Sequence, residues 1–92
     1  MTYIYVWTAD DKKFERIKKT LEFAKSLDET PVFCVNDLEA IEKITKNGFK
    51  AMNVDAVEDL LNVGDGSDTY ILCTPEEIES LKAIYKNVKE IL

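Results

Sequence analysis

The chain has no histidine, and only three of its 92 residues are glycine. Without an imidazole, Ser-His-Asp and Cys-His catalytic groups are excluded, and two separated cysteines make a poor zinc site. Neither GxGxxG nor GxxxxGK[ST], the glycine-rich loops that bind nucleotide phosphates, is present. We therefore expect no nucleotide, no other cofactor, no metal site and no catalytic residues.

Long apolar runs and cysteines are also scarce. No apolar run approaches the roughly 20 residues that cross a bilayer, and the first residues lack the pattern of a signal peptide. We expect a cytoplasmic protein without membrane contact. Cys34 and Cys73 lie in separate apolar runs and form no CxxC motif, which predicts buried free thiols.

Basic residues are fewer than acidic ones, 12 against 18, so the net charge is −6. Residues 1–30 carry six of each sign, whereas residues 31–68 carry three basic and eight acidic residues. An acidic chain repels phosphate backbones at long range, which counts against nucleic acid as a partner. It favours a partner with a basic surface.

What the chain does have is a repeated pattern of apolar runs followed by polar, helix-like segments. The run Tyr3-Ile-Tyr-Val-Trp7 is apolar on both faces, which is typical of a central strand in a parallel sheet. Strands are predicted at 2–8, 31–35, 49–53 and 69–73, and helices at 10–27, 36–47, 55–62 and 76–92. This βαβαβαβα order predicts a single small three-layer α/β domain, residues 1–92, whose four-stranded, mostly parallel sheet carries helices on both faces.

Lys50 indicates the order of the strands. A charged residue within the third predicted strand suggests a sheet edge, which favours the order 3-2-1-4. The alternative order, 2-1-3-4, would move Lys50 towards the interior.

Helical spacing predicts two buried helix faces. They consist of Phe14, Ile17, Leu21, Ala24 and Leu27 on the first helix, and Leu38, Ile41 and Ile44 on the second.

Each predicted helix starts with a short polar residue and an acid three positions later. The four motifs are Thr8-x-x-Asp11, Asn36-x-x-Glu39, Asp55-x-x-Glu58 and Thr74-x-x-Glu77. They are typical of capping boxes, in which two side chains satisfy the free amides of the first turn. Acids at these positions occupy the place where a helix start would otherwise bind phosphate.

The acids also resemble those of response-regulator receiver domains. Asp10 and Asp11 follow the first strand, Asp55 follows the third, and Thr74 follows the fourth. The resemblance implies a magnesium-dependent carboxylate site at Asp10 and Asp11, with Asp55 accepting a phosphoryl group. The sequence departs from that family because no fifth strand and no following lysine are predicted.

A second stretch, residues 31–54, is similar to the first strand and helix of Toprim domains. That family places a catalytic glutamate after the strand and a DxD pair after a later strand. Asn36 stands at the glutamate position here, and Thr74-Pro-Glu76 replaces the DxD pair. The likeness implies an inactive relative, and we assign the chain to neither family.

A basic stripe is predicted on the first helix, at successive turns of one face. It consists of Lys12, Arg16, Lys19 and Phe23. A row of basic side chains that ends in an aromatic residue suits an acidic partner or a single nucleic-acid strand. Nucleic-acid binding is therefore one alternative function.

An acidic segment spans residues 55–68. It contains Asp55, Glu58, Asp59, Asp65 and Asp68, with no basic residue between them. Such a segment can dock on a basic surface by electrostatic steering. The leading hypothesis is a small non-enzymatic protein, of the kind that phages encode, which regulates or inhibits a larger partner such as a nucleic-acid-binding protein.

Overall fold

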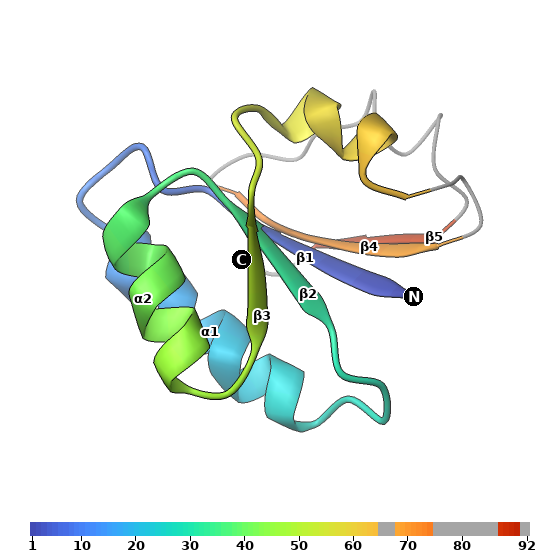
Figure 1. The fold of residues 1–92 in the computed structure, drawn as a ribbon, viewed down its shortest axis with the longest axis horizontal. Coiled ribbons are helices and arrows are strands. Elements are labelled where there is room, and N and C mark those ends of the chain that lie inside the picture. Colours follow the sequence, from blue (N-terminus) through green and yellow to red (C-terminus); the bar gives the residue numbers. More distant parts are fainter. Residues whose placement is uncertain (65–67, 75–86, 91–92) are drawn as a thin grey trace.

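The computed structural model describes residues 1–64, 68–74 and 87–90. Its elements are β1 (Thr2–Val6), α1 (Lys13–Lys25), β2 (Val32–Val35), α2 (Leu38–Lys46), β3 (Lys50–Asn53), the 3-10 helix η1 (Val57–Asn62), β4 (Thr69–Cys73) and β5 (Asn87–Glu90). The strands form one parallel sheet in the order β3-β2-β1-β4-β5 (Figure 1). The α/β fold and the predicted order 3-2-1-4 are confirmed, and Lys50 lies on an edge strand as expected.

The strand β5 corrects the prediction of a single helix over residues 76–92. It lies beside β4 with Tyr70 opposite Val88, so the sheet has a fifth strand. The four residues of β5 contain a single apolar residue, Val88, so their hydrophobic spacing cannot distinguish a strand from the end of a helix. The rest of the predicted helix, 76–86 and 91–92, lies outside the described residues.

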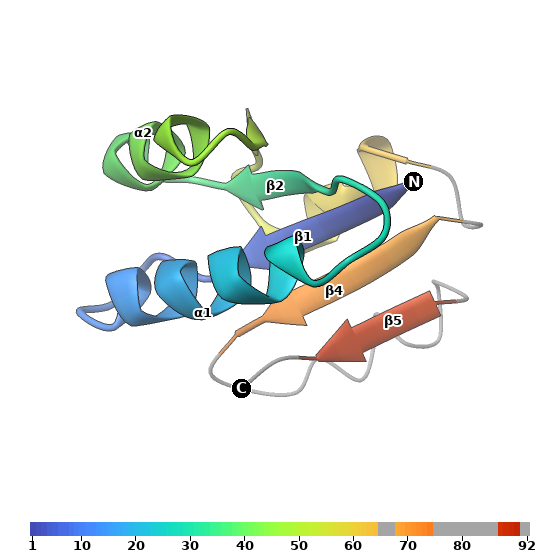
Figure 2. The same ribbon diagram turned by 90° about the horizontal axis from the view of Figure 1, so that it is seen from below.

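The order of the strands explains why helical segments lie on both faces of the sheet. The path from β1 through α1, β2 and α2 to β3 moves in one direction, and the connection through η1 returns past β2 and β1 to β4. Crossovers between parallel strands are right-handed, so a reversed direction places the connection on the opposite face. Accordingly, α1 and α2 lie on one side and η1 on the other (Figures 1 and 2).

The sheet divides the core in two, and β1 contributes to both halves. All five β1 residues are buried, with Tyr3 and Tyr5 facing η1 and Ile4 and Val6 facing the helices. The η1 side contains Tyr3, Tyr5, Cys34, Val54, Leu60, Tyr70 and Leu72. The helix side contains Ile4, Val6, Ile17, Leu21, Ala24, Phe33, Val35, Ala40, Ile44 and Ile71. This two-sided burial confirms that the first apolar run is a central strand.

Both cysteines are buried free thiols, as predicted. Burial raises the pKa of the Cys34 thiol to about 12, and it also raises the pKa of Cys73. Neither thiol is therefore ionised near neutral pH.

Within the described residues, no helix has the length and apolar character needed to span a membrane.

Two residues predicted to be buried on the helices are exposed instead. Phe14 is 37% exposed because α1 begins at Lys13, not at Asp10, which places Phe14 in the first turn. Its ring lies 5.1 Å from Lys13 Nζ and 5.4 Å from Lys43 Nζ. Leu38, the first residue of α2, is 81% exposed. Both predictions failed because helical spacing identifies which face of a helix is apolar, but it does not show how far along the helix that face is covered by the core.

The helix starts also differ from the predicted capping boxes. Asp37, rather than Asn36, caps α2, and its carboxylate accepts a hydrogen bond from the Ala40 amide at 2.9 Å. At η1, the Asp59 carboxylate accepts from the Ala56 amide at 3.2 Å, and α1 has no side-chain cap. Adjacent polar residues suit the N-cap equally well, so spacing alone did not choose between them. The fourth motif extends beyond the described residues.

Candidate functional site

The carboxyl edge of the sheet is the place where α/β proteins usually bind ligands. Ligands lie beyond the strand ends at the point where connections leave in opposite directions. Here that point lies between β1 and β4, since the chain runs from β1 to β2 on one side, whereas β4 and β5 lie on the other side of β1. Trp7 and Thr8 follow β1, and the buried Thr74 follows β4.

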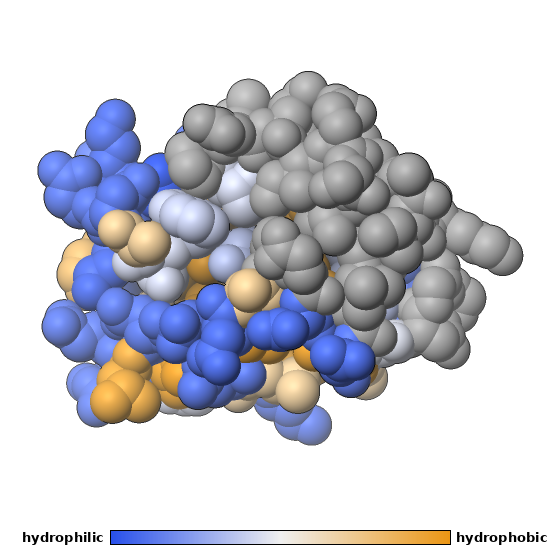
Figure 3. Space-filling model, turned by 90° about the horizontal axis from the view of Figure 1, so that it is seen from above, coloured by the Kyte–Doolittle hydropathy of each residue, from blue (hydrophilic) through white to orange (hydrophobic). Residues whose placement is uncertain are grey.

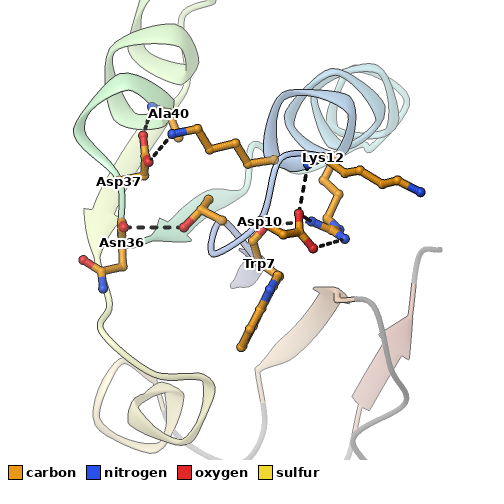
Figure 4. A network of polar contacts seen from close by, with 9 residues as sticks. Trp7, Asp10, Lys12, Asn36, Asp37 and Ala40 are labelled. Carbon is orange, nitrogen blue, oxygen red and sulfur yellow. Dashed lines mark hydrogen bonds and ion pairs between the residues drawn. The ribbon is translucent and has the colours of Figure 1, made fainter.

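Arg16 and Asp10 bind each other at this point. The Arg16 Nη1 and Nη2 atoms lie 2.6 and 3.0 Å from the two Asp10 carboxylate oxygens, and Nη1 also donates to the Trp7 carbonyl at 3.3 Å (Figure 4). The Lys12 backbone amide donates to the same carboxylate at 3.0 Å. These bonds lower the pKa of Asp10, chiefly through Arg16, and raise the pKa of Arg16. Both oxygens of Asp10 are therefore engaged by the chain itself.

A second ion pair joins the starts of α1 and α2. Lys13 Nζ lies 2.7 Å from Asp37 Oδ2, while the other Asp37 oxygen caps α2 (Figure 4). Hydrogen bonding lowers the pKa of Asp37 and raises the pKa of Lys13. The pair fixes the two helix starts side by side at the carboxyl edge.

The structure does not bring the acids of the receiver-like alternative together. A fifth strand is present, contrary to the sequence prediction, but the order 3-2-1-4-5 differs from the 2-1-3-4-5 order of receiver domains. Asp55 follows β3, and β2 separates that strand from β1 and from Asp10. Asp11 is exposed in the loop before α1. Among the described residues, no three metal-ligating side chains cluster.

The Toprim-like positions are also separated. Asn36 is exposed after β2, whereas Thr74 is buried after β4, and β1 lies between the two strands. The structure thus gives this likeness no shared site within the described chain.

The predicted basic stripe is not a continuous open surface. Lys12 and Lys19 are exposed, but Arg16 is engaged by Asp10 and only 13% of its side chain is accessible. Phe23 is partly buried against the helix-side core. Lys12 precedes α1, which begins at Lys13, and helical spacing could not show that the arginine reaches back to the loop before the helix.

The acidic segment is divided between two edges of the sheet. Asp55 and Asp59 are exposed at the start of η1, near the carboxyl edge. Asp68 precedes β4 at the opposite edge, where its carboxylate lies 3.1 Å from the amino group of Met1. The side chain of Glu58 and the whole of Asp65 lie outside the described part.

Exposed residues from three segments follow the carboxyl ends of β1, β2 and β3. The Val54 amide donates to the Val35 carbonyl at 3.0 Å, which holds the end of β3 beside the start of α2. Asp55 and Leu38 therefore follow strand ends that lie side by side. We define the carboxyl-edge surface as Asp11, Leu38, Glu39, Asp55 and Asp59, all exposed. Sequence reasoning missed Leu38, although its place directly after a capping residue could have indicated that it projects beyond the sheet.

The surface on the η1 side of the sheet is polar for the most part. Figure 3 looks onto this side, where the described part is mostly hydrophilic and apolar side chains appear in small patches.

Comparison with known proteins adds no family. No family model matches the chain, and no curated protein or solved structure matches it either.

Replacing Asp37 with Asn should remove part of the acid sensitivity of the fold. The pKa of Asp37 lies below its ordinary value of 3.8 because of Lys13. A carboxyl with a depressed folded-state pKa stabilises the fold above its unfolded-state pKa, and this contribution disappears as pH falls through the folded-state value. The D37N variant keeps a side chain that can cap α2, so it isolates the charge.

Urea midpoints measured between about pH 6 and about pH 2 check this expectation. The wild-type chain should be the more stable of the two at pH 6, and the difference should shrink below about pH 4. A difference that stays constant with pH would show that the ion pair does not contribute.

Proposed function

We propose that this chain is a non-enzymatic interaction protein that docks on a larger partner with a basic surface, as a regulator or inhibitor. One observation carries the proposal. At the edge where α/β enzymes place their ligands, Asp10 and Arg16 bind each other, while the carboxyl-edge surface exposes four carboxylates and a leucine. The available groups suit a protein partner better than a small ligand.

The carboxyl-edge surface combines two features that protein docking uses. Leu38 is 81% exposed, and burying a leucine side chain contributes about 1.5–3 kcal/mol. The surrounding carboxylates, together with the net charge of −6, attract a basic partner and orient it during encounter. The leucine would serve as an anchor and the acids as the source of specificity.

A charge-reversal variant tests the proposal. Combining Glu39→Lys with Asp55→Lys should weaken binding of the partner by about tenfold or more, because two attractive contacts become repulsive. The matched control combines Asp28→Lys with Glu29→Lys, which reverses the same number of exposed charges in the loop between α1 and β2, at the opposite edge.

The partner is first captured from an extract of the source cells and identified by mass spectrometry. Calorimetry with the purified partner then compares the wild-type chain, the two double variants and Leu38→Ala. The proposal predicts salt-sensitive binding that is lost at the carboxyl edge and retained in the control. Equal affinities for the edge and control variants would overturn it.

A further inference from the structure

A groove lies between α1 and α2, on the side of these helices that faces away from the sheet. It has a volume of about 300 Å³ and is lined by Lys18, Leu21, Glu22, Lys25, Lys43 and Asn47. The α1 residues follow one another at helical spacing, so they form a single wall, and α2 supplies the other. Figure 2 shows the two helices on the same side of the sheet. We call this feature the interhelical groove.

The interhelical groove is positively charged in a chain whose net charge is negative. Its lining contains three lysines and one glutamate. Two other cations of α1 are paired, since Lys13 lies 2.7 Å from Asp37 and Arg16 lies 2.6 Å from Asp10. Within the part of the chain that the structure describes, none of the three groove lysines lies within ion-pair distance of a carboxylate.

Apolar groups accompany these cations. Leu21, which is 5% exposed, lies in the lining, and Phe14 lies on the same face of α1, one turn before Lys18. The Phe14 ring is 37% exposed and stands 5.4 Å from Lys43 Nζ. The Lys43 ammonium group, which lines the groove, thus lies beside an exposed aromatic ring.

We infer that the interhelical groove binds an acidic peptide segment of a partner protein. Carboxylates of the segment would meet Lys18, Lys25 and Lys43, and an apolar side chain would lie against Leu21 and Phe14. This site is separate from the carboxyl-edge surface and accepts the opposite charge. It therefore gives the protein a second means of contact, beyond the function proposed above.

The position of the groove on the helices favours a peptide over a phosphate group. Lys25 is the last residue of α1, Lys43 lies in the last turn of α2, and Asn47 caps that helix. Phosphate sites use the free amides of helix starts, which these helix ends do not offer, whereas a peptide can place an apolar side chain beside Leu21 and Phe14. The acidic remainder of the chain also repels a long polyanion, while a short segment contacts only the groove.

Glu22 provides an internal test, because it is the one acid in the lining. It repels the carboxylates of an incoming segment and competes for the same lysines. Glu22→Gln should therefore tighten binding, whereas loss of the lysines should weaken it. Opposite effects from neighbouring residues would not arise from a general change in stability.

Fluorescence anisotropy with the purified full chain and a short labelled peptide of glutamate and leucine tests the inference. Combining Lys18→Ala with Lys43→Ala should weaken binding about tenfold, and Glu22→Gln should strengthen it severalfold. Lys50→Ala, on the edge strand β3, is the matched control and should have no effect. Reversal of Asp55 alone, which precedes η1 and lies outside both helices, should leave binding unchanged, which separates this test from the previous one.

Three further probes identify other occupants. A glutamine–leucine peptide should bind weakly, and an oligodeoxythymidylate should bind less tightly than the acidic peptide. The inference is overturned if the lysine variant binds the acidic peptide as the wild type does, or if the oligonucleotide binds more tightly. Salt-sensitive self-association that the lysine variant abolishes would identify a second copy of this chain as the occupant, and would overturn it as well.

Discussion

Replacing Phe33 with Ala is expected to lower the free energy of unfolding by about 3–5 kcal/mol. Phe33 is fully buried on β2, between β1 and β3, and its ring meets the edge of the Phe49 ring at 5.5 Å between centroids. Removing the ring leaves a cavity between the sheet and the helices. Domains of this size have roughly 5–15 kcal/mol of stability, so much of it would be lost.

Urea unfolding followed by circular dichroism measures this change. Met52→Ala is the control, because Met52 lies on the neighbouring strand β3 but is 42% exposed, and its loss should cost less than about 1 kcal/mol. Similar losses in the two variants would contradict the placement of Phe33 between sheet and helices.

Replacing Gly64 with Ala should be the next most damaging change, at about 1–3 kcal/mol. A methyl group at this position would lie 2.6 Å from the Tyr70 hydroxyl and 2.8 Å from Tyr3 Cε2, and it would also meet Asp68. The two tyrosine rings are buried and stacked, with centroids 5.6 Å apart, so they cannot move away easily. The cost arises from overpacking.

Thermal unfolding of the G64A variant gives the size of this effect. For a domain of this length, each kcal/mol lowers the melting temperature by about 4–8 °C. Asn62→Ala, at an exposed position in η1, is the control and should have little effect. A melting temperature for G64A equal to that of the control would show that the space beside Tyr70 is open.

The sequence predicted the arrangement of the sheet well, because its signals are local. A run that is apolar on both faces must be covered on both sides, which placed β1 at the centre, and Lys50 placed β3 at an edge. Gly48, with φ of 86°, follows α2 as expected of a residue that accepts the left-handed conformation.

The contacts of the candidate site could not be predicted in the same way. Helical spacing assigned Arg16 to a basic stripe, but it does not reveal that a long side chain reaches back to Asp10. Leu38 fits the apolar face of α2, and only the position of the helix start relative to the sheet shows that it is exposed.

The interhelical groove lay outside the reach of sequence patterns for a similar reason. Lys18 and Lys25 are on one helix and Lys43 is on another, and their convergence depends on how α1 packs against α2. Spacing along one helix contains no information about the alignment of two helices. The charge balance of a groove therefore becomes visible only in three dimensions.

The central proposal is that the carboxyl edge serves docking and does not bind magnesium, since Arg16 and the Lys12 amide engage both carboxylate oxygens of Asp10. Nuclear magnetic resonance of the isotope-labelled chain, titrated with millimolar magnesium, tests it most directly. We predict that the amide signals of Thr8, Asp11 and Lys12 stay in place and that the melting temperature is unchanged. Saturable shifts of these signals, together with thermal stabilisation by magnesium, would contradict the account.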